Sequence, residues 1–196
     1  MKVAIVRYNA GNVSSVIHAM ERLGTEYVLT DDREILQTAD RVIFPGVGEA
    51  AGTMRYLRHT GLDIVIRNLK QPVLGICLGQ QLMCASSQEG DTDCLGIFNV
   101  PVLRFKPGSA EDKIPHMGWN DIHINDRKMF GDIPDGQFVY FVHSYYVPVC
   151  EWTAATTDYI LPFSAALHKD NFYATQFHPE KSGAAGERIL ETFLTL

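Results

Sequence analysis

Cys77 stands where a chain would place a nucleophile. The sequence around it, Gly75-Ile76-Cys77-Leu78-Gly79, joins the end of an apolar run to a segment with helical spacing. A cysteine flanked in this way is typical of a sharp strand-to-helix turn that exposes the nucleophile at the carboxyl end of a sheet. The start of the helix favours a thiolate and offers the N–H of Leu78 to an oxyanion. A buried structural cysteine is the alternative, and the pentapeptide alone does not exclude it.

A histidine and a carboxylate follow far along the chain, in the segment ATQFHPEKSG. We expect His178 to end a strand, because Pro179 cannot continue the hydrogen-bond ladder. In extended geometry Glu180 projects to the same side as His178 and holds one imidazole nitrogen, which leaves the other facing a thiol. Cys77, His178 and Glu180 would then be nucleophile, base and orienting group. A lone histidine at a strand end is usually structural, but beside a cysteine turn the catalytic interpretation is favoured.

The segment Pro45-Gly46-Val47-Gly48 ends another apolar run. Its glycines permit unusual backbone angles, so the N–H groups of Val47 and Gly48 are candidates for an oxyanion hole. Peptides flanked by glycine also flip easily, and we expect the Val47 N–H to turn away from Cys77 in an inactive state. The alternative is a plain tight turn.

The segments that carry these motifs alternate between strand and helix patterns. Apolar runs predict strands over residues 3–8, 26–30, 41–44 and 72–77, and helical spacing predicts helices over 12–24, 31–39, most of 50–69 and 78–87. Asn12 is the expected N-cap of the first helix. This order implies an α/β fold with a parallel sheet covered by helices on both faces.

After residue 90 the strand patterns follow one another without helices between them. We expect mostly antiparallel strands over 121–125, 137–147, 151–159, 163–170 and 171–177, and a closing helix over 183–196. No repeat or linker interrupts the chain, so a single domain over residues 1–196 is the simplest interpretation.

Composition narrows the classes of protein that remain. The chain has 196 residues, 46% of them hydrophobic and 20% charged, with a net charge of −6, which is typical of a globular protein and argues against nucleic acid or an anionic membrane as partner. No apolar run is long enough to span a membrane, and no cleavage site follows the first apolar run, so we expect a cytoplasmic protein. The four cysteines, of which Cys84, Cys94 and Cys150 carry no motif, form no C-x-x-C pair, so we expect free thiols and no metal site.

The motifs PGVG, GICLGQQ and QFHPE, in this order and spacing, resemble the class I (triad) glutamine amidotransferases over nearly the whole chain. The stretches PHMGWN, YFVHSYY, YNAGNVSS and HPEKSG resemble one subgroup, the glutaminase subunits of imidazole glycerol phosphate synthases. The resemblance implies that family's flavodoxin-like sheet, parallel at its centre and antiparallel in the C-terminal half. One departure is Gln80, where many relatives have methionine, and it puts fine details of the pocket in doubt.

The resemblance also implies a reaction without a cofactor. The Cys77 thiolate would attack the side-chain amide of glutamine, and the N–H groups of Leu78 and of the Val47–Gly48 region would hold the oxyanion. His178 would protonate the departing ammonia, and water would release glutamate from the thioester.

The family further implies residues that bind substrate. Gln81 and Glu89 would bind the α-amino end and amide region of glutamine, and the backbone of His143, Ser144 and Tyr145 would contact its carboxylate. Without the resemblance, Gln81 would be interpreted as an exposed helix residue and Glu89 as a solvated charge.

The implied partner is a (β/α)8-barrel cyclase subunit that receives the ammonia and forms a heterodimer with this chain. Trp119 and Lys181 resemble residues that face it, although a packed aromatic and a solvated lysine are the plain alternatives. The sequence has no phosphate-binding loop or nucleotide fingerprint, so the nucleotide site would belong to the partner.

Three other functions stay open at this point. A paralogous glutaminase could supply a different synthase, such as one that aminates a sugar. A stand-alone γ-glutamyl or peptide hydrolase would share the cysteine turn, but the chain is short for one. A non-enzymatic flavodoxin-like binding module would not need Cys77, His178 and Glu180 together.

Overall fold

The computed structural model describes residues 1–8, 13–46, 48–109 and 111–196. The strands of its main sheet are β1 (Lys2–Val6), β2 (Glu26–Thr30), β3 (Arg41–Phe44), β4 (Val73–Ile76), β8 (His116–Ile124), β9 (Gln137–His143), β11 (Thr153–Tyr159), β12 (Leu161–Lys169) and β13 (Phe172–Thr175). Within the described residues they form a nine-stranded sheet in the order β2-β1-β3-β4-β13-β12-β11-β8-β9. The pairs from β2 to β13 are parallel and those from β13 to β9 are antiparallel, as the sequence predicted.

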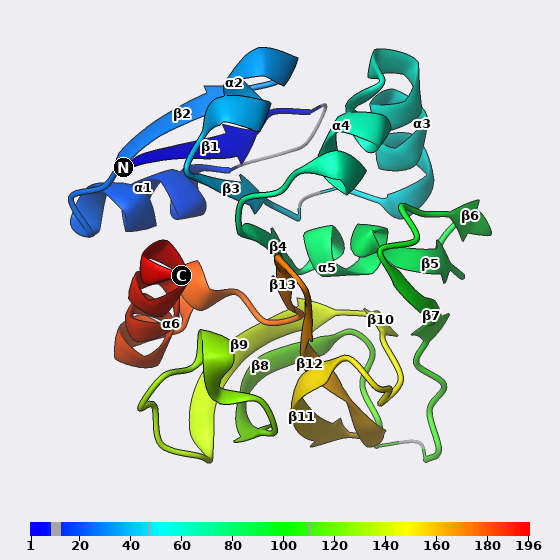
Figure 1. Cartoon of the computed structure of the whole chain (residues 1–196). Helices are drawn as coiled ribbons and strands as arrows, with labels where there is room; N and C mark the ends of the chain where they lie inside the picture. The colour runs from blue at the N-terminus through cyan, green and yellow to red at the C-terminus, as the bar shows by residue number, and fades with distance from the viewer. Residues whose placement is uncertain (9–12, 47, 110) are drawn as a thin grey trace.

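Helices cover both faces of the parallel half (Figure 1). They are α1 (Ser14–Arg22), α2 (Arg33–Thr38), α3 (Ala50–Thr60), α4 (Leu62–Asn68), α5 (Leu78–Met83) and α6 (Gly183–Thr195). Alternation along β1 separates two cores: Val3 and Ile5 pack in the core that contains α1 and α6, whereas Ala4 and Val6 pack in the core that contains α2 to α5. No helix in the described ranges combines the length and the apolar character that crossing a membrane requires.

A second, smaller sheet follows α5 and was not predicted. It consists of β5 (Cys84–Ser87), β6 (Thr92–Asp93), β7 (Phe98–Arg104) and β10 (Tyr145–Tyr146), in the order β10-β7-β5-β6. The helix predicted over 78–87 is therefore too long, because residues 84–87 leave it to pair with β7 in parallel and with β6 in antiparallel register. The helical segment 50–69 is also broken, at Gly61, whose φ of 71° ends α3.

The start of the first helix was only partly predictable. The structure begins α1 at Ser14, with Val13 at the N-cap and no side-chain cap there. Asn12, the predicted cap, lies outside the described residues.

Candidate active site

Cys77 occupies a strained turn between β4 and α5. Its φ of 52° is positive, which is rare for a residue with a side chain, and it begins the helix directly. Both flanking glycines are required by close packing: a Cβ on Gly75 would lie 2.9 Å from the Met83 sulfur, and one on Gly79 would collide with the backbone carbonyl of Phe44. The sequence predicted this turn.

His178 and Glu180 meet, but through different local geometry than predicted. The chain past β13 is not an extended strand: His178 is the N-cap of a short 3₁₀ turn, η2 (Pro179–Lys181), and Glu180 lies in its middle. The turn still brings His178 Nδ1 to 2.8 Å from Glu180 Oε1, with both residues buried. The structure contains the predicted contact between His178 and Glu180, but a 3₁₀ turn forms it instead of an extended strand.

The charge of His178 depends on its two neighbours. Burial lowers the pKa of His178, but hydrogen bonds to the Cys77 sulfur and to Glu180, together with the negative charges of both, outweigh burial and raise it to about 10. At neutral pH His178 is therefore favoured as an imidazolium, between the Cys77 sulfur and Glu180. This state supplies an acid that is ready to give up a proton.

A cavity of about 410 Å³ opens over Cys77. Its lining residues are Gly46, Gly48, Cys77, Leu78, Gln81, Glu89, Pro115, Val142, His143, Ser144, Tyr145, His178 and Lys181. The structure thus brings most of the predicted site residues to one cavity, from segments far apart in the sequence. Glu180 lies behind His178, and Val47 lies outside the described residues.

Glu89 and Gln81 are held in place by the protein. Glu89 is half-buried, and its Oε2 accepts a hydrogen bond of 2.8 Å from the backbone N–H of Ala50, at the start of α3. Burial raises the pKa of Glu89, the Ala50 N–H lowers it and the charge of Glu49 raises it, with a net increase. Gln81 is buried, and its Nε2 donates to the Tyr145 carbonyl at 3.1 Å. Neither side chain is the freely solvated group that its sequence context alone suggested.

The segment from His143 to Tyr145 is braced by a second histidine. His143 Nδ1 lies 2.7 Å from the Tyr145 carbonyl oxygen, so this nitrogen donates, and Nε2 must accept from His116 Nδ1 at 3.1 Å. Burial lowers the pKa of His116 to about 4 and that of His143 to about 3, so both rings are neutral. His116 was not predicted as part of the site, although it lies in the stretch PHMGWN, which resembles the glutaminase subunits.

Trp119 lies away from the cavity, on an exposed apolar surface. Met117, Trp119 and Phe138 are 63%, 56% and 60% exposed on the hairpin of β8 and β9. The rest of that hairpin face includes Val142, opposite Met117, which lines the cavity. Lys181 is exposed at the rim of the same cavity.

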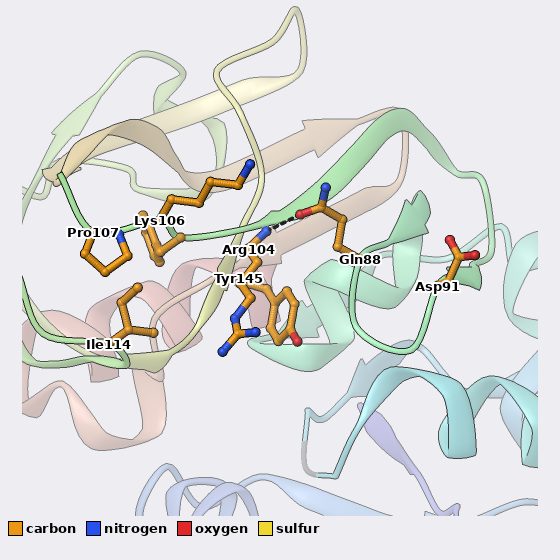
Figure 2. Close-up of a pocket in the computed structure, with 8 residues that line it drawn as sticks. Gln88, Asp91, Arg104, Lys106, Pro107, Ile114 and Tyr145 are labelled. Carbon is orange, nitrogen blue, oxygen red and sulfur yellow. Dashed lines mark hydrogen bonds between the residues drawn. The ribbon is translucent and has the colours of Figure 1, made fainter.

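A second hollow, of about 810 Å³, shares Tyr145 with the cavity over Cys77 (Figure 2). It is lined by Gln88, Asp91, Arg104, Phe105, Lys106, Pro107, Ile114 and Tyr145, and it holds no cysteine or histidine. The Arg104 backbone N–H donates to Gln88 Oε1 at 2.8 Å, and Figure 2 shows the Arg104 and Tyr145 side chains pointing the same way. Although larger, this hollow is lined by neither Cys77 nor His178.

Two groups that contact the Cys77 sulfur were not predicted from the sequence. The Val142 carbonyl oxygen lies 3.9 Å from the Cys77 sulfur, and Nε2 of the buried Gln176 lies 3.7 Å from it. The signal for Gln176 was its place two residues before His178 in QFHPE. Gln80, the one departure from the family motif, instead donates to the Ser164 carbonyl at 3.3 Å and does not line the cavity.

Comparison with known proteins agrees with this geometry. The model of the family "Glutamine amidotransferase class-I" matches residues 5–196. The chain is 66% identical over 196 residues to the imidazole glycerol phosphate synthase subunit HisH of Bacteroides thetaiotaomicron, and 44% identical over 198 residues to that of Yersinia pseudotuberculosis, with all of each protein covered.

Solved structures show the same fold at low sequence identity. A putative GMP synthase protein from Thermoplasma acidophilum aligns with a TM-score of 0.75 at 20% identity, over 100% of this chain and 92% of that one. PurLQS from Thermotoga maritima aligns with a TM-score of 0.70 at 19% identity, over 99% and 97%. From the match to the family model and the full-length identity to its members, we conclude that the chain belongs to the class I glutamine amidotransferase family.

Proposed function

We propose that this chain is the glutaminase subunit of an imidazole glycerol phosphate synthase and acts as one domain over residues 1–196. The observation that carries the proposal is that Cys77 and His178 line one cavity, with the buried Glu180 bonded to His178 behind it. Full-length identity to subunits named HisH supports the assignment to this synthase.

We assign each residue a part in glutamine hydrolysis. The Cys77 thiolate attacks the amide carbon. The backbone N–H groups of Leu78, Val47 and Gly48 donate hydrogen bonds to the oxyanion. His178 gives its proton to the amide nitrogen, so that ammonia leaves and a thioester remains. It then accepts a proton from water, which attacks the thioester and releases glutamate. Glu180 keeps His178 oriented and favours its protonated form.

The substrate's charged end lies where the protein offers matching groups. Both N–H groups of the Gln81 amide are used within the protein, at Tyr145 and Gln176, so Gln81 Oε1 is left to accept from the α-ammonium group. Glu89 adds a carboxylate on the same cavity, and backbone groups of His143–Tyr145 hold the α-carboxylate.

A partner subunit fits the exposed hairpin better than a stand-alone hydrolase does. Apolar side chains as exposed as Met117, Trp119 and Phe138 mark an interaction surface when they gather beside an active site. The hairpin is tied to the catalytic segment, because the His178 N–H donates to the Tyr140 carbonyl at 2.9 Å. We assign this surface, with Lys181 at the cavity rim, to a (β/α)8-barrel cyclase subunit that takes up the ammonia in the cytoplasm.

The proposal is tested by measuring glutamate release from this chain alone, with the cyclase subunit of the same organism, and with that cyclase together with its nucleotide substrate. We expect turnover to rise strongly only with the partner and its ligand. High turnover from the isolated chain would favour a γ-glutamyl hydrolase. Activation by a sugar-aminating synthase, and not by the cyclase, would favour the paralogous function.

A further inference from the structure

Gln176 reaches the nucleophile because of the register between two strands. Parallel pairing of β13 with β4 ends at Thr175 opposite Ile76, and the Cys77 N–H donates to the Thr175 carbonyl at 2.7 Å. The residues that follow these two strands, Gln176 after β13 and Cys77 after β4, must therefore lie side by side. Gln176 is completely buried, and its Nε2 lies 3.7 Å from the Cys77 sulfur, within the hydrogen-bond range of a sulfur acceptor.

The orientation of the Gln176 amide follows from a backbone carbonyl, which cannot flip. The Tyr145 carbonyl oxygen accepts from Gln81 at 3.1 Å, so Gln81 must direct its NH₂ group to this side. The same NH₂ group lies 3.0 Å from the amide of Gln176, which must therefore accept this hydrogen bond with its oxygen. The Gln176 NH₂ group is then directed at the sulfur. Flipping either amide would bring two donors or two acceptors together.

We propose that Gln176 is a further catalytic residue, which donates an amide N–H to the Cys77 sulfur and stabilises the thiolate. Gln81 and Tyr145 fix the direction of this donor. The proposal deepens the glutaminase function and rests on it only for the identity of the reaction, because the contact to sulfur exists without substrate.

The donor has a use at both ends of the reaction. Before attack, the N–H favours the thiolate over the thiol, whose S–H would instead donate to the Val142 carbonyl oxygen at 3.9 Å. After water adds to the thioester, the carbon–sulfur bond breaks and its electron pair returns to the sulfur. The same N–H then stabilises the departing thiolate, while His178 handles the proton.

The test measures the thiolate directly, in the full chain without glutamine or partner. The rate at which iodoacetamide alkylates Cys77 is followed from pH 5 to 10, with the modified peptide identified by mass spectrometry. The titratable and charged groups around Cys77 are His178, with Glu180 behind it, and Glu89, His143, Tyr145 and Lys181 on the cavity. The Gln176→Met change keeps all of them and removes only the amide.

We expect Gln176→Met to raise the midpoint of the alkylation profile by about one to two pH units, which is the effect of losing one hydrogen bond to a charged group. Gln176→Leu, which also lacks the donor, should shift it in the same direction. Gln80→Met is the matched control: it removes a buried amide one residue before Gln81 whose contact is with Ser164, and its profile should match that of the unmodified protein.

Gln81→Leu is the second route, because it leaves β13 intact if changes at Gln176 prevent folding. Without the donor from Gln81, the Gln176 amide is free to flip, and the midpoint should rise by a smaller amount. Unchanged midpoints in a folded Gln176→Met protein, or in Gln81→Leu if the former does not fold, would reduce Gln176 to a packing residue. Failure of the glutaminase proposal would appear separately, as absent glutamate release from the unmodified protein with its partner.

Discussion

His178 Nδ1 lies 2.8 Å from Glu180 Oε1, and the two side chains are only 7% and 3% exposed. Within the described residues, the other carboxylate oxygen of Glu180 has no hydrogen-bond partner. The charge of Glu180 is therefore directed at the imidazole alone, in a setting where water screens it little. The pair keeps His178 protonated next to Cys77.

Glu180→Gln should reduce glutaminase turnover less than His178→Ala does. A glutamine keeps an oxygen that can accept from His178 Nδ1, so orientation survives while the negative charge is lost, whereas His178→Ala removes the proton carrier. We expect turnover to fall about 10–100-fold in Glu180→Gln and more than about 10³-fold in His178→Ala, measured with the activating partner present. An equal or larger loss from Glu180→Gln would contradict these roles.

The same change should move the alkaline limb of the pH–rate profile. The pKa of His178 is raised to about 10, partly by Glu180, so the protonated form needed to expel ammonia is lost only as the pH approaches that value. Removing the carboxylate removes a contribution that raises this pKa, and the alkaline limb of kcat/KM should shift toward neutral pH. A limb that stays in place or moves upward would argue against His178 as the acid.

Ser182→Ala should loosen the catalytic turn. The Ser182 hydroxyl accepts from the Tyr140 N–H at 3.0 Å and donates to the His178 carbonyl at 2.6 Å, deep in the protein. Its loss leaves a buried N–H without a partner, at a cost of about 1–3 kcal/mol in the free energy of unfolding. Urea unfolding measures this cost, and Thr195→Ala on the exposed end of α6 is the control. A loss no larger than the control's would refute the bracing role.

Much of this arrangement follows from local sequence signals. The turn at Cys77, the strand at 26–30 and the change to antiparallel strands after residue 90 each depend on patterns within a few residues. The features that were not predicted depend on pairing between segments that are distant in the sequence. Residues 84–87 form a strand because β7 lies beside them, and Gln176 reaches Cys77 because β13 inserts next to β4. The contact between His178 and Glu180 was predicted, but the 3₁₀ turn that makes it was not.

Acid should destabilise the protein through its neutral histidine pair. The folded pKa values of His116 and His143 are about 4 and about 3, below the ordinary 6.5, so the unfolded chain binds protons first. The contribution of the two neutral histidines to the free energy of unfolding is then fully present above pH 6.5. It falls as the pH drops toward 4, by up to about 1.4 kcal/mol per pH unit for each histidine. His116→Phe, which keeps an aromatic ring between Phe141 and Tyr159, should make this slope shallower in urea unfolding. An unchanged slope would contradict the assignment.

Trp119→Asp should weaken binding of the cyclase subunit. A large exposed aromatic at the centre of an interface commonly contributes more than about 2 kcal/mol, so the dissociation constant should rise by at least about 30-fold. Ile64→Asp is the control, because Ile64 is 59% exposed on α4, away from the hairpin. Sedimentation of the mixed subunits measures both. Equal effects of the two changes would remove the hairpin as the docking surface.

The most direct measurement compares glutamine and ammonium salts as nitrogen source for the complex that carries Cys77→Ala. If Cys77 only generates ammonia and the cyclase uses it, synthesis of imidazole glycerol phosphate from glutamine should fall by a factor on the order of 10⁴ or more, while synthesis from ammonium stays near the unmodified rate. Near-normal synthesis from glutamine in the Cys77→Ala complex would contradict the proposed catalytic role.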